Sequence, residues 1–179
     1  MPVDHTTRPS TVDATALAAL SGTWCLDPAG SAVEFTGRHF LVLPVRGSFP
    51  VRSGRAELAA DGTLAHIEAT VGASGFDSGN PQRDTAVRGP RFLDAGRFPE
   101  LRLTGGRLDA DASLTGRLEV KGRTTAATFT VEELTVRGER VTVRAAARID
   151  RHACGVGGLR GLVGAELRVR VRAVFVREG

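Results

Sequence analysis

The side chains that most often carry catalysis or bind metals are few in this sequence and lie far apart. The histidines and cysteines are His5, His39, His66, His152, Cys25 and Cys154. No two histidines stand at metal-ligand spacing, and neither a Cys-x-x-Cys motif nor a Gly-x-Ser-x-Gly elbow occurs, so the sequence predicts no metal site and no catalytic constellation. His39 or Glu34 could act as a single acid or base, which keeps an enzyme acting on a hydrophobic small molecule as the alternative hypothesis.

The segment 83–101 concentrates charged residues, two phenylalanines and two X-Pro pairs within one short stretch. Asp84 could cap a turn of helix or pair with Arg83, and the Gly-Pro and Phe-Pro pairs would break any longer helix. We therefore expect a short helical insertion at about residues 80–98. Such an insertion is either a lid over an apolar interior or a plain connection between strands.

Around this insertion the chain alternates apolar and polar residues with a period of two, which is typical of strands with one buried face. The clearest runs are 31–40, 66–71, 113–122, 141–150 and 165–176. Turn signals such as Asp61-Gly62 and Lys121-Gly122 separate the runs, and no helical pattern lies between them, so consecutive strands should pair as antiparallel hairpins. We predict an all-β fold in which about eight strands close into a barrel, with a β-sandwich as the alternative.

Many of the residues expected on the inner face of this barrel are small. They are Gly37, Ala69, Gly116, Ala145, Ala147 and Ala173. Small apolar linings favour a cavity that accepts an apolar ligand, because an eight-stranded barrel has room for one small molecule when its inner side chains do not fill it. The other interpretation is that loops and the few phenylalanines fill the interior.

The N-terminal residues 1–20 are predicted to form a flexible arm with a short helix, capped by Ser10 or Thr11 and stopped at Gly22. Residues 21–179 would then form the single barrel domain. The sequence shows no secretory signal and no apolar run long enough to span a membrane, and its two distant cysteines are typical of a reducing compartment. We therefore expect a cytoplasmic protein.

The charge of the chain is uneven. The formal net charge is +4, and the segment 137–179 alone holds ten arginines and four acidic residues. Single-strand nucleic-acid binders interleave basic residues with aromatic ones, whereas Arg168, Arg170 and Arg172 alternate with aliphatic residues and alanine. The sequence therefore predicts no nucleic-acid partner, and arginines that coat the outer face of strands.

Five segments follow one another along the chain in a suggestive order. They are GTWCLDPAGSAVEF (22–35), RHFLVLPVRGSF (38–49), RDTAVRGPRFLDAGRFPELRL (83–103), LTGRLEVKGRTTAATFTV (114–131) and IDRHACGV (149–156). Together they resemble the YceI-like family of polyisoprenoid-binding, lipocalin-like barrel proteins. The chain departs from the family pattern at Gly30 and Ala86, where histidine is usual, and at Cys154, where phenylalanine is usual.

The resemblance implies an eight-stranded antiparallel lipocalin-like barrel with a helical insertion and an elongated apolar pocket. It also implies a homodimer, no cofactor, and a ligand such as an isoprenoid, an isoprenoid quinone, or a fatty-acid or long-chain amide lipid, bound for storage, transport or sequestration. The residues that we then expect to line the pocket are Phe35, Phe49, Ile67, Val71, Leu103, Leu118, Phe129, Val143 and Leu167, with Phe92 and Phe98 from the insertion. The candidates for meeting a polar head group are Arg83, Arg88, Arg91 and His39.

Overall fold

A computed structural model describes residues 5–7, 13–39, 43–158 and 164–179 of the chain. Its helical segments are α1 (Ala14–Ala18), the 3-10 turn η1 (Ala73–Gly75) and α2 (Pro81–Arg88). Its strands are β1 (His5–Thr7), β2 (Gly22–Leu26), β3 (Ala32–His39), β4 (Leu43–Phe49), β5 (Val51–Leu58), β6 (Leu64–Gly72), β7 (Glu100–Leu108), β8 (Ser113–Val120), β9 (Arg123–Arg137), β10 (Arg140–Asp150) and β11 (Glu166–Arg177).

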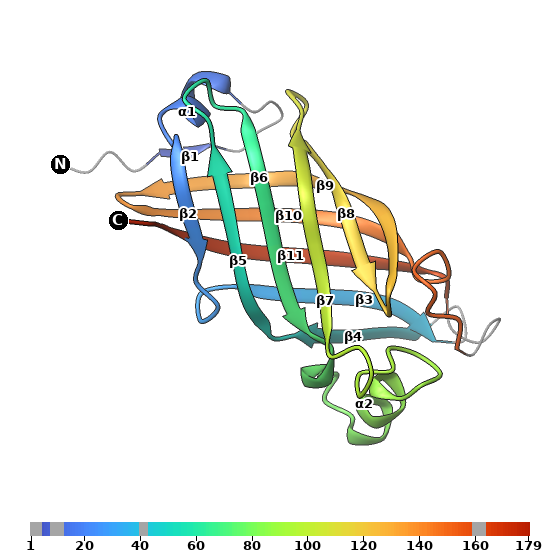
Figure 1. The fold of residues 1–179 in the computed structure, drawn as a ribbon. Coiled ribbons are helices and arrows are strands. Elements are labelled where there is room, and N and C mark those ends of the chain that lie inside the picture. The colour runs from blue at the N-terminus through green and yellow to red at the C-terminus, as the bar shows by residue number, and fades with distance from the viewer. Residues whose placement is uncertain (1–4, 8–12, 40–42, 159–163) are drawn as a thin grey trace.

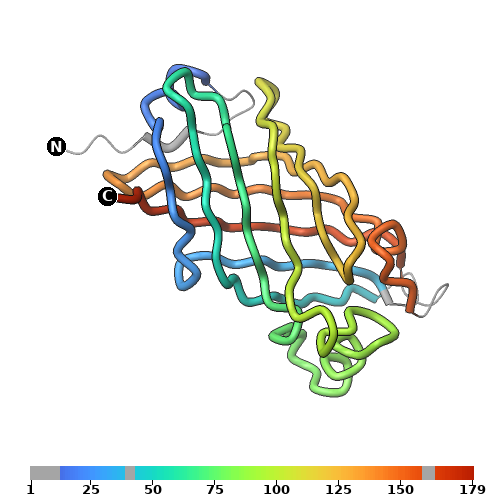
Figure 2. The backbone as a smooth tube through the Cα atoms, in the orientation of Figure 1, coloured from blue at the N-terminus to red at the C-terminus, as the bar shows by residue number. Residues whose placement is uncertain are grey.

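The strands close into an eight-stranded antiparallel barrel, as predicted. The closed circuit runs β2–β5–β6–β7–β8–β9–β10–β11 and returns from β11 to β2. The hairpin β3–β4 prolongs β2 and β5, so that β11 pairs with β2 near its end and with β3 over Arg168–Arg172. Figures 1 and 2 show the result as two walls, with β2 and β5–β8 crossing in front of β3, β4, β10 and β11.

The step from β2 to β3 is fixed by side chains of the first family-like segment. The backbone N–H of Asp27 donates to Val174 O at 2.8 Å, and the N–H of Val174 donates to Ser31 Oγ at 2.9 Å. The Asp27 carboxylate also pairs with Arg140 on β10. These contacts satisfy the backbone of β11 where its partner changes, because a buried amide without an acceptor would destabilise the sheet.

The period-two pattern of the sequence corresponds to the two faces of each strand. Along β11, Val169, Val171 and Ala173 are half-buried on the inner side, whereas Arg168 and Arg170 are exposed. Successive side chains of a strand point to opposite faces, so this alternation holds the aliphatic residues inside the barrel and the arginines in water.

The N-terminal helix lies over one end of the barrel, beside the β5–β6 turn (Figure 1). Its N-cap is Asp13, whose carboxylate accepts from the Thr15 N–H at 2.8 Å, and not the predicted Ser10 or Thr11, which lie outside the described residues. Gly62 in the turn has φ +85°, and a Cβ there would lie 2.7 Å from Ala14 O, so glycine lets the turn touch α1.

The same turn carries a perturbed carboxyl group. The backbone N–H of Thr63 donates to Asp61 Oδ1 at 2.9 Å, and this hydrogen bond lowers the pKa of Asp61 below its ordinary value. An Asx turn of this kind stabilises the reversal of the chain between β5 and β6.

The insertion at the opposite end is helical only in its first half. Asn80 caps α2 by accepting from the Arg83 N–H at 3.1 Å, and Pro81 occupies the first turn, where its missing N–H has no consequence. Asp84 is buried and accepts from the N–H and hydroxyl of Ser78 at 2.9 and 2.6 Å. It therefore fixes the loop before the helix, and its partner is Ser78 and not the Arg83 that the sequence suggested.

Candidate functional site: an apolar cavity inside the barrel

The barrel holds a cavity of about 1180 Å³, and most of the side chains on its wall are apolar. The wall follows β10 from Val141 to Ile149 and β11 from Leu167 to Phe175. Each of these runs covers eight residue steps, and at a rise of roughly 3.3 Å per residue the cavity extends about 26 Å along the strands. Pockets for drug-sized ligands usually fall between about 300 and 1,000 Å³, so this cavity suits a longer molecule.

A cluster of three phenylalanines forms part of the wall. The ring centroids of Phe35, Phe49 and Phe76 lie 5.3–5.8 Å from one another, in tilted and stacked arrangements that aromatic pairs favour. Gly47 on β4 makes room for the cluster, because a Cβ there would lie 2.6 Å from the Phe35 ring and 2.7 Å from Phe76. The rings therefore occupy the space that a side chain at position 47 would need, so only glycine fits there.

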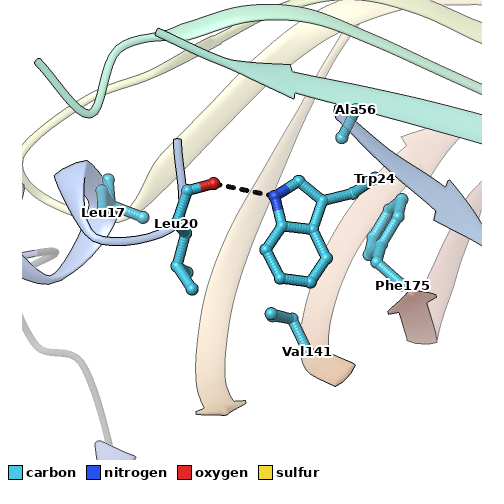
Figure 3. Packing of buried hydrophobic residues seen from close by; sticks show 6 residues of the cluster. All are labelled: Leu17, Leu20, Trp24, Ala56, Val141 and Phe175. Atoms are coloured by element: carbon cyan, nitrogen blue, oxygen red, sulfur yellow. Dashed lines mark hydrogen bonds between the residues drawn. The ribbon is translucent and has the colours of Figure 1, made fainter. Parts of the chain in front are cut away.

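Leu17 and Leu20 close the end of the cavity nearest α1. Both leucines are buried and pack with Trp24 on β2 and Phe175 on β11, as Figure 3 shows. The indole N–H of Trp24 donates to Leu20 O at 2.8 Å, which satisfies the one polar atom of a side chain that is only 2 % exposed. This end of the cavity is thus capped by apolar side chains.

At the other end, Phe92 from the insertion lies against the loop that follows β10. A buried arginine, Arg151, fixes this loop by donating to the carbonyl oxygens of Gly164, Val156 and Gly158 at 2.8–2.9 Å. Its guanidinium also lies 5.9 Å from the centre of the Phe92 ring. Carbonyl acceptors compensate the desolvation of the buried charge, so Arg151 has a structural role at this end of the barrel.

The structure brings ten of the eleven predicted lining residues together on the cavity wall. Phe98 is the exception: its ring packs on the β8–β9 turn, where a Cβ at Gly122 would lie 2.9 Å from it. The chain turns back at Asp94, which has φ 50°, and this reversal carries Phe98 away from the cavity. The ten residues on the wall are Phe35, Phe49, Ile67, Val71, Phe92, Leu103, Leu118, Phe129, Val143 and Leu167.

Of the predicted head-group residues, the structure places Arg83 on the cavity wall. Arg88 is engaged elsewhere, since its Nε donates to Phe76 O at 3.1 Å and so fixes the chain between η1 and α2. Arg91 is exposed and lies off the wall. His39 is the last residue of β3, and its side chain lies outside the described part of the chain.

Several wall residues were not predicted from the sequence. Leu17 and Leu20 stand three positions apart, a helical spacing that could have marked them as one apolar face. Phe76 follows a glycine-rich stretch without periodicity, and no sequence signal places it. In addition to Arg83, nine polar residues contribute to the wall: Asp13, Thr15, Ser31, Arg38, Asn80, Gln82, Arg102, Arg151 and Arg172.

Within the described ranges, no three or more His, Cys, Asp or Glu residues are grouped so that they could hold a metal ion. Among the helices of those same ranges, none is long and apolar enough to cross a membrane.

Three solved structures are similar to this one in fold. The crystal structure of Burkholderia cenocepacia BcnA is similar with a TM-score of 0.70 and 22% identity, over 83% of this chain and 98% of that one. A polyisoprenoid binding domain from Saccharophagus degradans gives a TM-score of 0.69 at 14% identity, over 87% of this chain and 98% of that one. The Campylobacter jejuni YCEI protein gives a TM-score of 0.63 at 13% identity, over 79% of this chain and 90% of that one.

At these identities the solved structures establish the fold alone. A search of curated proteins gave no match. The family model of the YceI-like domain, however, matches residues 24–175, which run from within β2 to within β11 and so span the closed barrel. The chain therefore belongs to the YceI-like family.

Proposed function

We propose that this protein binds an apolar long-chain ligand inside its barrel, for storage, transport or sequestration. The observation that carries the proposal is the 1180 Å³ cavity with its predominantly apolar wall. The candidate ligands are an isoprenoid, an isoprenoid quinone, or a fatty-acid or amide-like lipid. The polyisoprenoid binding of the Saccharophagus degradans domain supports this choice of ligand class.

The free energy of such binding would come from burial of the ligand against the apolar side chains of the wall. Each methylene group removed from water contributes about 0.8 kcal/mol, so a long chain could bind tightly without directional contacts. A polar head would stay at the end of the cavity where Arg83, Arg38 and Asn80 contribute to the wall. Arg83 is suited to meet an anionic head, because its guanidinium has no ion pair or hydrogen bond with any other described residue.

The proposal is tested by native mass spectrometry of the purified protein, followed by organic extraction of anything bound. Ala69→Phe would fill the cavity, since Ala69 lies on its wall, and we expect it to lose the bound lipid. Ala65→Phe is the matched control, because Ala65 is exposed on the same strand and lies off the wall. A protein that carries no lipid and binds no apolar probe would refute the proposal.

We further propose that the ligand is held and not converted, so that the recovered molecule matches the one supplied. The alternative, an enzyme acting on a hydrophobic small molecule, predicts a product in the extract after incubation. His39 is a candidate for the single acid or base that such an enzyme would use. If a His39→Ala variant no longer formed the product, the enzyme hypothesis would be favoured.

The proposal also includes the oligomeric state of the protein and its location in the cell. We propose a homodimer, on the resemblance to the family, and a cytoplasmic location. Light scattering on the purified protein gives the mass in solution, and a value at the monomer mass of 18.9 kDa would refute the dimer. Fractionation of the producing cells tests the compartment.

A further inference from the structure

Arginines gather on the outer surface of the wall formed by β4, β3, β11 and β10. Arg46 on β4 pairs in register with Thr36 on β3, Thr36 pairs with Arg168 on β11, and Arg168 pairs with Arg148 on β10. Residues in register project to the same face, and neighbouring strands lie about 4.8 Å apart, so these three arginines form a single row across four strands. Arg170 is exposed on the same face, two residues further along β11, and we call these four residues the basic wall.

The arginines of the basic wall stand where they repel one another and so destabilise the pairing of β10 with β11. Arg148 stands directly opposite Arg168, and two rows further along the same face Arg144 stands opposite Arg172. Like charges directly opposite one another destabilise an antiparallel pair. Arg46 lies on β4 at the end of the strand order, where a charged side chain can protect an exposed sheet edge. The same reason does not explain Arg168 and Arg170, because β11 is flanked by β10 and β3 and has no exposed edge here.

Two of the four charges of the basic wall have an acidic neighbour, and the other two, on Arg46 and Arg168, have none among the described residues. Arg46, Arg168 and Arg170 make no ion pair or side-chain hydrogen bond with any other described residue. Arg148 has a carboxylate partner, Glu166, at 3.5 Å, and both side chains are more than 60% exposed. The acidic residue in register with Arg170 is Glu34, which leaves the face with a net positive charge.

The basic wall lies beside the end of the cavity that holds Phe92. Arg38, on β3, is exposed and also contributes to the cavity wall. Its carbonyl oxygen accepts from the Gly164 N–H at 2.9 Å, and the Gly164 carbonyl in turn accepts from Arg151 at 2.9 Å. Leu43, at the start of β4, is 57% exposed and lies at this same end, opposite His39.

We propose that the basic wall docks this end of the barrel onto an anionic membrane surface. Arginines near such a surface are attracted to its acidic lipid head groups, and an exposed leucine at the border can enter the interface. A nucleic acid fits the face less well, because single-strand binding uses aromatic side chains for stacking, and the registered positions of the wall hold arginine, threonine, glutamate, serine and alanine.

The experiment is flotation of the full chain with two vesicle preparations, phosphatidylcholine alone and phosphatidylcholine mixed with phosphatidylglycerol. The protein should bind only the mixed vesicles, and binding should fall as NaCl rises from about 0.05 M to about 0.5 M. The combined variant Arg46→Gln, Arg168→Gln, Arg170→Gln removes three charges from the basic wall. We expect it to weaken binding about a hundredfold, from the attraction typical of each arginine near an anionic surface.

The charge-matched control removes three arginines from the opposite wall, on β5, β7 and β8: Arg52→Gln, Arg107→Gln, Arg117→Gln. It should keep most of the binding, and circular dichroism should show both variants folded. Equal losses in the two variants, no binding to the mixed vesicles, or tighter binding of single-stranded RNA than of vesicles would each overturn the proposal. None of these outcomes depends on the cavity being loaded, so the proposed function is judged separately by its own extraction experiment.

Discussion

At the scale of single residues, the arginines of this chain have three different roles. Arg151 is buried and holds three carbonyl oxygens, Arg83 lies on the cavity wall, and Arg168 stands on the outer face against another arginine. Sequence composition cannot separate these roles, because the three side chains are identical and only their surroundings differ. The consequences of substitution should therefore differ from one arginine to the next.

Arg83→Met should weaken binding of a carboxylate-headed chain about tenfold and leave a neutral alcohol of the same length nearly unaffected. The reason is that a charge-assisted hydrogen bond is lost while the apolar contacts are kept. Arg91→Met is the control, since Arg91 belongs to the same insertion and lies off the wall. Titration calorimetry with both ligands measures the effect, and equal losses for the acid and the alcohol would exclude Arg83 as the head-group residue.

Arg168→Gln should stabilise the fold, by about 0.5 kcal/mol at low salt, because it removes a like charge opposite Arg148. The gain should vanish at high salt, where the repulsion is screened. Urea denaturation at two salt concentrations measures it, with Arg117→Gln as the control, because Arg117 faces Thr104 and Ala126. A loss of stability at low salt would show that the arginine has a favourable partner.

At the scale of elements, the period-two pattern predicted five strands, β3, β6, β8, β10 and β11, because each of them has one face toward the apolar cavity. The inner residues of β6, Ile67, Ala69 and Val71, could be identified from alternation alone. The insertion could not be resolved in the same way: Phe92 and Phe98 look equivalent in sequence, and a backbone reversal between them decides which one faces inward. Packing against residues that are distant in the sequence therefore determines which of the two phenylalanines lines the cavity.

The short helix α1 shows a related limit of local signals. Five residues are too few for a stable isolated helix, so its helicity depends on packing of its apolar side chains against the barrel. Sequence propensity indicated that a helix was present, whereas the burial of Leu17 against Trp24 depends on contacts with residues of distant strands.

Leu17→Ala should lower the free energy of unfolding by about 2–3 kcal/mol, the lower part of the range of about 2–5 kcal/mol for a buried leucine, because one side of Leu17 faces the cavity. The leucine is 9% exposed and packs in the cluster of Figure 3. Leu43→Ala, at a position that is 57% exposed, is the control and should change stability by less than about 0.5 kcal/mol. Urea denaturation compares the two, and equal small effects would mean that α1 does not cap the barrel.

At the scale of the whole molecule, the cavity links ligand binding to stability. The ten strands from β2 to β11 all contribute to a wall that touches both ends of the barrel, so a bound chain would contact nearly every element at once. A ligand that binds only the folded state at a free concentration of about a hundred times its Kd stabilises that state by about 2.7 kcal/mol.

For a chain of this size that stabilisation should raise Tm by roughly 5–10 °C, which scanning calorimetry with a long-chain lipid would detect. The single tryptophan, Trp24, lies on the cavity wall and gives an independent fluorescence signal for the same event. Ala69→Phe should abolish both responses, because its ring would occupy the ligand's space, while Ala65→Phe should keep them. If the ligand raised the Tm of Ala69→Phe as much as that of the unchanged protein, the lipid would be binding outside the barrel, because the new ring would occupy the space inside it.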